Sequence, residues 1–469
     1  MSQNSFRSLL CSTLLIFCAL SARSALAQLE TRASISDPGE PQSLAASDFN
    51  GDGFLDLAVA SFNGDLSVLL GNGDGTFRRP VSYGANDAYT VVSGDLRNHG
   101  ISDLVVTNPG KASVSVLLGN GDGTFQPAVR YPMVGEATFA ALGDFNNDGN
   151  LDVAVASETG CYCITVMFGN GTGTLGKQVH TPAPYTTQLL GVGDFNGDGF
   201  LDVVTAGQFG GTSVMGVLLG NGDGTFRTGE SYPIYIGPQS ITVADFNGDG
   251  ILDVAVAEPE GGAISIFLGN GDGTFRAAPT IGASFPGSVV SADINGDGIP
   301  DLVAVTSFNS NLISVFLGNG DGTFQPGMDF PAVVAGGIAV GDFNGDHKPD
   351  VAVGGYIGNS VLTLLNTGVV DFSPTTPLNF KNQEHGTTSE PQTVTLTNTG
   401  KTSLKISGMK ASAQFGMSST CGKSVVAGGA CKISVTFSPT SQGAKSGTVT
   451  INDSASSKPQ VIELSGTGT

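Results

Sequence analysis

The sequence has few positive charges, few histidines and none of the common catalytic motifs. Its 469 residues include 20 Lys and Arg against 41 Asp and Glu, a net charge of −21. Nucleic-acid binding needs a basic surface, so this acidic chain is a poor candidate for it. The sequence lacks G-x-S-x-G, H-E-x-x-H, P-loop and paired-cysteine zinc patterns. The four histidines are His99, His180, His347 and His385.

Long hydrophobic runs are also scarce, because the only one lies near the N-terminus. It extends from Leu9 to Leu20, follows Arg7, and precedes the small-x-small site Ala25-Leu26-Ala27. This pattern predicts a signal peptide over residues 1–27. The run is shorter than the roughly 20 residues that a membrane span requires. We therefore expect a secreted or cell-surface protein without a membrane span.

Four cysteines are left once Cys11 and Cys18 are removed with the signal peptide. Cys421 and Cys431 are ten residues apart, and an oxidising compartment favours a disulfide between them. Cys161 and Cys163 stand at strand spacing on one face, and both a bridge and a pair of free thiols are compatible with that spacing. Neither pair is interpreted as metal-binding.

A nine-residue motif dominates the chain, first seen as DFNGDGFLD over residues 48–56. It begins again at Asp95, Asp144, Asp194, Asp245, Asp293 and Asp342, with steps of 47 to 51 residues. A period near fifty indicates a propeller, solenoid or array. Six loops carry Asp at positions 1, 5 and 9 and the loop at 95–103 carries two Asp, which accounts for 20 of the 41 acidic residues.

The motif predicts an oxygen cage for a hard divalent cation. D-x-N-x-D-G matches the first half of an EF-hand loop, but position 12 is Val59 where an EF-hand needs Glu, so the cage closes early. We expect Ca²⁺ in five complete loops, with the position-7 carbonyl as a further ligand; Mg²⁺ suits such a cage less well. The alternative is that the oxygens bond only local amides, which leaves three repelling carboxylates. The predicted ligands are Asp48, Asn50, Asp52, Phe54, Asp56, Asp144, Asn146, Asp148, Asn150, Asp152, Asp194, Asn196, Asp198, Phe200, Asp202, Asp245, Asn247, Asp249, Ile251, Asp253, Asp293, Asn295, Asp297, Ile299 and Asp301.

Two loops depart from this pattern. The seventh keeps Asp342, Asn344, Asp346, Lys348 and Asp350 as ligands but has His347 at position 6, which we expect to need a positive φ and so to weaken binding. In the second loop Arg97 and His99 replace two oxygens. We predict no calcium at 95–103, with the Arg97 guanidinium bridging Asp95 and Asp103.

Each repeat reads as four short strands, the third and fourth separated by a Gly-Asn-Gly-Asp-Gly-Thr-Phe hairpin such as residues 71–77. We interpret the hairpin Asp as a local cap rather than a second metal site, and the Phe after each first Asp as packing. The last repeat lacks its fourth strand, and Thr31–Ser36 lies at the register that would supply it. The sequence thus predicts a seven-bladed β-propeller over 28–368, closed by an N-terminal strand.

These motifs resemble the FG-GAP/VCBS repeats of integrin α-like propellers. That resemblance implies cation loops at one end of the ring and ligands at the loops of the other end. After a linker at 369–377, alternating strands over 378–469 predict an immunoglobulin-like β-sandwich. Segments such as Gln392-Thr-Val-Thr-Leu-Thr-Asn398 and the terminal Leu464-Ser-Gly-Thr-Gly-Thr469 resemble choice-of-anchor modules of the abnormal-spindle and hydin type. The expected fold class is all-β.

The expected function is a calcium-binding recognition or adhesion module for an extracellular protein or glycan, and not an enzyme. The alternatives are a polysaccharide lyase or hydrolase, or a purely structural cell-surface protein. A binding module predicts exposed aromatic residues opposite the cation loops, whereas an enzyme predicts carboxylates, His or Tyr converging in a cleft. The irregular segments 84–91, 132–140, 180–190 and 232–238 are where we expect a ligand site.

Overall fold

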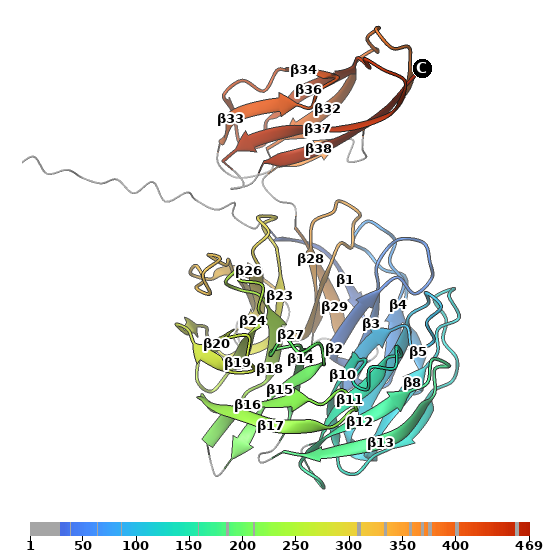
Figure 1. Cartoon of the computed structure of the whole chain (residues 1–469), viewed down its shortest axis with the longest axis vertical. Coiled ribbons are helices and arrows are strands. Elements are labelled where there is room, and N and C mark those ends of the chain that lie inside the picture. Colours follow the sequence, from blue (N-terminus) through green and yellow to red (C-terminus); the bar gives the residue numbers. More distant parts are fainter. Residues whose placement is uncertain are drawn as a thin grey trace, which may run out of the picture.

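The computed structural model describes residues 29–469, except 38, 63, 86, 158, 184–186, 210–211, 307–310, 333–334, 356–358, 367–369, 374–377, 399–402 and 455–458. The predicted signal peptide and part of the predicted linker lie outside these residues. The described chain consists of strands and one 3-10 turn, η1 (Pro109–Lys111) (Figure 1). No helix in this part of the chain is long and apolar enough to cross a membrane. The all-β prediction is confirmed.

The strands up to β29 form seven separate sheets among the described residues. Successive innermost strands contact one another, and β27 contacts β2, so the sheets form a closed ring. In chain order the sheets are β2 (Glu40–Ser47), β3 (Asp56–Phe62), β4 (Leu66–Leu69) and β5 (Val81–Tyr83); β6 (Val91–Gly94), β7 (Asp103–Asn108), β8 (Ser113–Leu117) and β9 (Val129–Pro132); β10 (Ala137–Gly143), β11 (Asp152–Ser157), β12 (Cys163–Gly169) and β13 (Leu175–Pro182); β14 (Leu189–Gly193), β15 (Asp202–Phe209), β16 (Thr212–Gly220) and β17 (Phe226–Ile234); β18 (Ser240–Ala244), β19 (Asp253–Glu258), β20 (Ala263–Gly269), β21 (Phe275–Ala277) and β22 (Ile281–Gly282); β23 (Pro286–Ala292), β24 (Asp301–Thr306), β25 (Leu312–Phe316) and β26 (Met328–Pro331); and β27 (Ala335–Gly341), β28 (Asp350–Gly355), β29 (Ser360–Asn366) and β1 (Leu29–Ser36).

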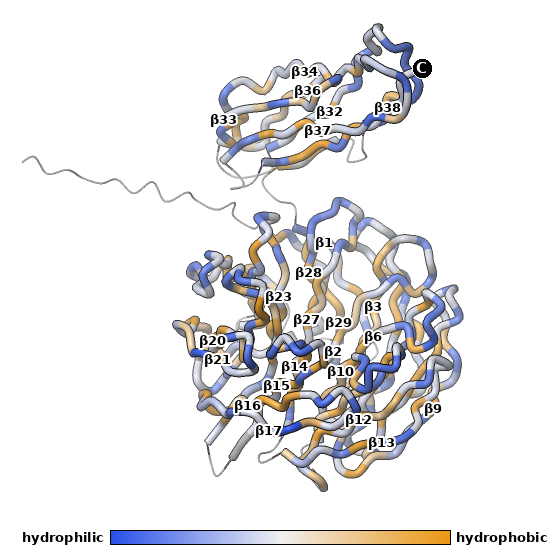
Figure 2. The backbone as a smooth tube through the Cα atoms, in the orientation of Figure 1, coloured by the Kyte–Doolittle hydropathy of each residue, from blue (hydrophilic) through white to orange (hydrophobic). Residues whose placement is uncertain are grey.

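The second strand of each sheet is largely buried, because both of its faces meet a neighbouring sheet. Strands β7, β11, β19, β24 and β28 are buried along their whole length. Such strands read as continuous apolar runs rather than as alternating patterns. Figure 2 shows the same contrast, with hydrophobic residues along the strands and hydrophilic residues in many of the loops.

The N-terminal strand closes the ring as the sequence predicts. Strand β1 pairs antiparallel with β29, with Leu29 opposite Asn366 and Ser36 opposite Ser360. It thereby covers an edge that would otherwise expose unpaired backbone groups.

The fourth strands are less regular than the sequence interpretation suggests, and proline explains the difference. Only an isolated bridge joins Gly71 to Phe77 in the first sheet, and β5 begins at Val81, after Pro80. In the fifth sheet the strand is split into β21 and β22 around Pro279. Proline has no N–H to donate to a ladder. The fourth strands β13 and β17 have no proline directly after their hairpins and are eight and nine residues long.

The C-terminal strands form two facing sheets around one core, in an immunoglobulin-like sandwich. The core includes Val394, Leu396, Ile433, Val435 and Phe437, all fully buried. The first sheet begins with β30, inside the span predicted as linker, and β31 forms one edge of the second sheet, where it pairs parallel with β38. The strands are β30 (Asp371–Ser373), β32 (Gln392–Thr397), β36 (Ala430–Phe437) and β34 (Phe415–Ser419) in one sheet, and β31 (Leu378–Gln383), β38 (Gln460–Gly468), β37 (Gly443–Asp453), β33 (Leu404–Ala411) and β35 (Ser424–Val425) in the other.

Disulfides join both of the cysteine pairs among the described residues. Cys421 is bonded to Cys431 within the sandwich, and Cys161 is bonded to Cys163 just before β12. The Cys161–Cys163 disulfide decides between the bridge and the pair of free thiols, the two alternatives that the spacing of these residues left open.

Candidate functional site

Each repeated loop joins the first strand of a sheet to the second, and its side-chain oxygens are held by the loop's own backbone. In the first loop Asp48 Oδ1 accepts from the Gly51 N–H at 2.7 Å, and Oδ2 accepts from Gly53 at 2.8 Å. Asn50 Oδ1 accepts from the Asp52 N–H at 2.8 Å. The same three bonds recur in the loops that begin at Asp194 and Asp245. The loops are therefore folded alike before any ion is considered.

The Asp at position 9 is fully buried and ties its loop to the next hairpin. In the first sheet Asp56 Oδ2 accepts from the Phe49 N–H at 2.9 Å and Oδ1 from the Gly71 N–H at 2.7 Å. Desolvation raises the pKa of Asp56 to about 6, and the charges of Asp52 and Asp48 add to the rise. The pKa of Asp152 and of Asp253 is likewise raised to about 6, first by desolvation.

The donor set of these loops suits a hard cation by its chemistry. Five loops offer carboxylate and amide oxygens at positions 1, 3, 5 and 9, and desolvation, followed by the charges of the neighbouring Asp residues, raises the pKa of the buried Asp. Calcium is bound by such oxygens, six to eight at a time. Across the described residues, however, no three His, Cys, Asp or Glu side chains stand together as a preformed metal cluster. The oxygen ligands of these loops therefore have the chemistry that calcium requires. In the structure, their carboxylates accept hydrogen bonds from the loop backbone.

Position 6 needs a left-handed backbone, as the sequence interpretation assumed. Gly53 has φ +86°, and His347 at the same position of the seventh loop has φ +64°. Position 4 is left-handed too, with Gly51 at +72° and Asn147 at +59°. The seventh loop also carries Lys348, whose Nζ lies 3.9 Å from Asp346 Oδ2 and donates to the Val370 carbonyl. An ammonium group there competes with a cation for the same carboxylate.

The second loop has Arg97 and His99 in place of two predicted ligand oxygens, but the predicted bridge is only half right. The Arg97 guanidinium contacts both oxygens of the buried Asp103, at 3.2 and 2.6 Å, and donates to the Gly119 carbonyl. It does not bridge to Asp95. That carboxylate instead pairs with His99, whose Nδ1 lies 3.0 Å from Oδ1. His99, four residues after Asp95, thus takes the position that was assigned to arginine.

Aromatic contacts couple five of the seven loops to the hairpin of the following sheet. The ring centroids of Phe49 and Phe125 are 5.3 Å apart in an edge-on arrangement, and the Gly123 N–H donates to the Phe49 carbonyl at 3.0 Å. The pairs Phe145–Phe226, Phe195–Phe275, Phe246–Phe324 and Phe343–Phe77 repeat this geometry. These phenylalanines pack between sheets, as the sequence interpretation proposed. The state of a loop is thereby linked to the contact between two blades.

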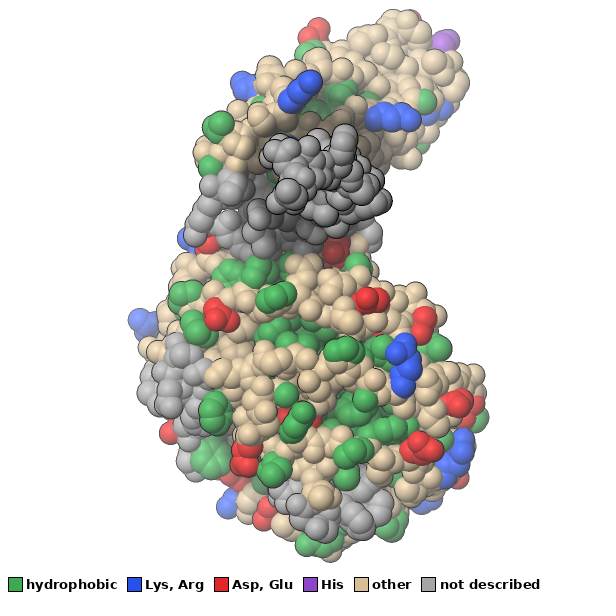
Figure 3. All heavy atoms as spheres, turned by 90° about the vertical axis from the view of Figure 1, so that its left-hand side faces the viewer, with side chains coloured by type: hydrophobic (Ala, Val, Ile, Leu, Met, Phe, Trp, Pro, Cys, Tyr) green, Lys and Arg blue, Asp and Glu red, His purple; other side chains and the backbone are tan. Residues whose placement is uncertain are grey.

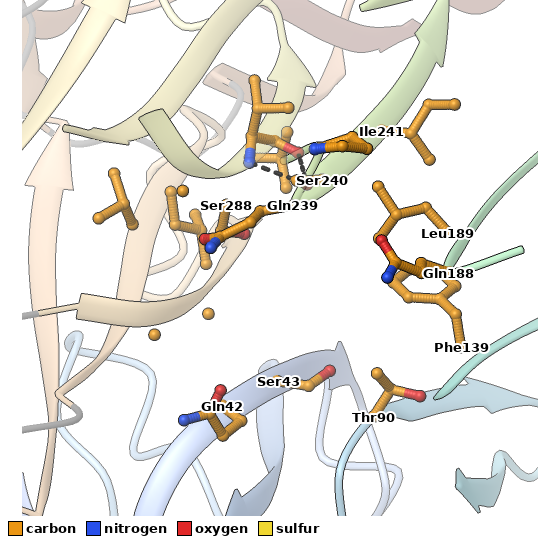
Figure 4. A pocket seen from close by; sticks show the side chains of 18 of the residues that line it. Gln42, Ser43, Thr90, Phe139, Gln188, Leu189, Gln239, Ser240, Ile241 and Ser288 are labelled. Atoms are coloured by element: carbon orange, nitrogen blue, oxygen red, sulfur yellow. Dashed lines mark hydrogen bonds between the residues drawn. The ribbon is translucent and has the colours of Figure 1, made fainter. Parts of the chain in front are cut away.

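A cavity of about 750 Å³ lies at the other end of the central channel. It is lined by the first residues of the inner strands, among them Gln42, Thr90, Gln188 and Ser240, whereas the cation loops follow the last residues of the same strands. We call the end with the cavity the mouth face. All four irregular segments singled out in the sequence contribute to the lining, with Tyr89, Phe139, Gln188 and Pro238 as examples (Figure 4).

Exposed large apolar side chains gather on the mouth face. Seven of them lie at, or next to, the strand ends on the mouth face. They are Phe62, Tyr89, Val134, Tyr162, Tyr235, Ile236 and Phe285. Figure 3 shows hydrophobic side chains recurring over the propeller surface on the side it presents. Among the described lining residues, Glu260 is the only acidic one and none is Lys, Arg or His.

Comparison with known families identifies the fold. The chain is a repeat β-propeller followed by an immunoglobulin-like module, and it belongs to the FG-GAP-like repeat family, whose model matches residues 48–106, 95–155, 144–205, 194–256, 245–304 and 293–353. Residues 367–461 match the family described as abnormal spindle-like microcephaly-associated, ASPM-SPD-2-Hydin. Both predicted resemblances are confirmed. Together the two families indicate a recognition or binding module of the extracellular type. No curated protein matches the sequence.

Several solved structures are similar to parts of the chain at low identity. A protein from Lactobacillus plantarum is 15% identical, covers 62% of this chain and 85% of its own, and gives a TM-score of 0.49. The periplasmic gluconolactonase of Pseudomonas aeruginosa is 15% identical over 62% of this chain and 85% of its own, with a TM-score of 0.48. An ASH/PapD-like domain of human CEP192 is 19% identical, covers 22% of this chain and 85% of its own, and gives a TM-score of 0.17.

One of these neighbours corrects the expectation that the chain is not an enzyme. The Pseudomonas aeruginosa protein is named a periplasmic gluconolactonase. The absence of a motif such as G-x-S-x-G from the sequence therefore does not exclude catalysis.

Proposed function

We propose that the chain is an exported recognition module in which the propeller binds a protein or glycan at its mouth face. One observation carries this proposal. Seven exposed large apolar residues lie in mouth-face segments, around a cavity at the channel end. Ligand sites combine such apolar surface with a few converging polar groups.

Calcium is the second part of the proposal. The ligands would come from the complete loops at 48–56, 144–152, 194–202, 245–253 and 293–301, with a weaker site at 342–350 and none at 95–103. When bound, the ion would supply positive charge to carboxylates that otherwise repel one another. The chain's own contribution is the fixed loop backbone and the Phe-to-Phe contact with the next sheet. Calcium would therefore stiffen the ring from the end opposite the ligand.

The test is binding of the exported chain, residues 28–469, to a panel of glycans and matrix proteins, in calcium and in EDTA. We expect retention of one ligand class in calcium and weaker retention in EDTA, because a loosened ring positions the mouth face less well. Circular dichroism shows whether the chain is folded in both buffers. A folded chain that retains no member of the panel in calcium would overturn the recognition proposal.

A further inference from the structure

Three glutamines occupy one register around the channel mouth. Gln42, Gln188 and Gln239 each stand six residues before the first Asp of their own cation loop, in the first, fourth and fifth sheets. All three line the cavity, and Figure 4 shows them around one open space. The equivalent positions in the sixth and seventh sheets are Gly287 and Gly336. Amide groups therefore line one part of the mouth and bare backbone lines another.

The polar groups of the cavity are almost all uncharged. Besides the glutamines, the described lining includes the hydroxyls of Ser43, Thr90, Ser240 and Ser288, and its only charged residue is Glu260. A glutamine amide both donates and accepts hydrogen bonds, as does a hydroxyl. A phosphate or carboxylate ligand is normally held by Arg, Lys or backbone N–H groups. This lining suits a ligand rich in hydroxyl groups and without charge.

An exposed aromatic residue at the same mouth is held in an unfavourable backbone conformation. Phe285 lines the cavity, is 54% exposed and has φ +46°. A bulky residue at positive φ is a genuine outlier, and the following residue, Pro286, further restricts Phe285 toward extended conformations. Strain of this kind, of order 1–3 kcal/mol, concentrates at ligand sites. Burial does not explain why an aromatic residue occupies this position, because more than half of the surface of Phe285 is exposed.

The size and surroundings of the cavity fit the same ligand. Its volume of about 750 Å³ lies within the range of small-molecule sites, about 300–1,000 Å³. Tyr89 lines it as a second partly exposed aromatic residue. Aromatic rings offer flat apolar surface, and amide groups provide directional hydrogen bonds. Sugars present both an apolar ring face and hydroxyl groups.

From this combination we infer that the mouth binds an uncharged carbohydrate. The amides of Gln42, Gln188 and Gln239 bond its hydroxyls, and Phe285 and Tyr89 cover the apolar face of a sugar ring. This inference rests on the proposed recognition function and names the ligand class of the same site. It assigns no role to the cation loops in contacting the ligand.

The test uses isothermal titration of the exported chain in calcium with neutral hexasaccharides of β-1,4-glucose, α-1,4-glucose, xylose and mannose, and with hexagalacturonate as the acidic counterpart. The variants are Gln239→Ala and Phe285→Gly, and Gln126→Ala is the matched control, because Gln126 is exposed but lies outside the cavity. We expect at least one neutral hexasaccharide to bind. Each mouth variant should weaken it by about tenfold or more, the size of one or two lost contacts, and Gln126→Ala should leave it unchanged.

The melting temperature of the variants and the class of ligand that binds keep the possible outcomes distinct. Phe285→Gly should melt at the same temperature as the parent or higher, since glycine adopts φ +46° without strain, so lost binding cannot be assigned to misfolding. Neutral sugars that bind equally to parent and mouth variants would overturn the inference, as would binding of hexagalacturonate or of matrix proteins alone. The last two results would leave the recognition proposal standing, whereas silence toward every ligand class would overturn both.

Discussion

Glu258 allows the pH dependence of propeller stability to be tested at one residue. Its side chain is fully buried at the mouth end of β19. Oε1 accepts from the Tyr235 N–H at 3.0 Å, and Oε2 accepts from the Ser265 hydroxyl at 2.7 Å. Desolvation raises the pKa of Glu258 from 4.5 to about 7, although both hydrogen bonds oppose the rise.

The sign of the effect follows from which state holds the proton. Between pH 4.5 and about pH 7 the folded chain keeps the Glu258 proton that the unfolded chain has lost, so the free energy of unfolding falls as the pH rises through this window. The full loss above it is about 3 kcal/mol, at about 1.4 kcal/mol for each pKa unit. Gln in its place stays neutral, accepts from Tyr235 and donates to Ser265. Glu258→Gln should therefore match the parent near pH 4.5 and exceed it by about 3 kcal/mol at pH 8.

Urea unfolding of the exported chain at several pH values, in saturating calcium, measures this difference. Glu260→Gln is the control, because it makes the same substitution at an exposed glutamate two residues further on. A Glu258→Gln chain that is no more stable than the parent at pH 8, or a difference that is constant across pH, would refute the reasoning.

Three further predictions concern the cation loops. Arg97→Asn combined with His99→Asp recreates the oxygen pattern of the other loops at 95–103 and should add one bound calcium per chain by elemental analysis; an unchanged calcium content would contradict the ligand assignment. His347→Gly should raise the free energy of unfolding by about 1 kcal/mol, because it removes a side chain at φ +64°, and a loss of stability would count against this account of position 6. Exhaustive EDTA should lower the melting temperature of the propeller, since an ion bound only by the folded state stabilises it, and unchanged melting would rule out calcium as a structural ion.

Much of the propeller could be predicted because its signals are local and repeated. The position of β1 opposite β29 follows from counting back from the first loop. The left-handed backbone at position 6 follows from Gly in six of seven loops, and the structure extends it to His347. Position 4 carried the same signal, because it is Gly or Asn in every loop, yet only the structure shows that it is left-handed as well.

Other features depend on contacts between distant segments. Gln42, Gln188 and Gln239 form no motif, and their shared register has meaning only once the ring places the starts of the inner strands around one channel. The pairing of His99 with Asp95 was missed because an arginine and a histidine can each reach either of two carboxylates, and spacing alone does not decide between them. Strand β30 is three residues long, and because it is so short its sequence was interpreted as part of the linker. Its pairing with β32 shows that it belongs to the sandwich.

The most direct test of the account is retention of a ligand by a chain whose mouth face alone has been changed. Parent and Gln239→Ala/Phe285→Gly chains would be compared over the same glycan and matrix-protein panel in calcium, after their melting temperatures have been shown to agree. The account predicts that a ligand retained by the parent is lost by the double variant. Equal retention of that ligand by both chains would contradict recognition at the mouth of the channel.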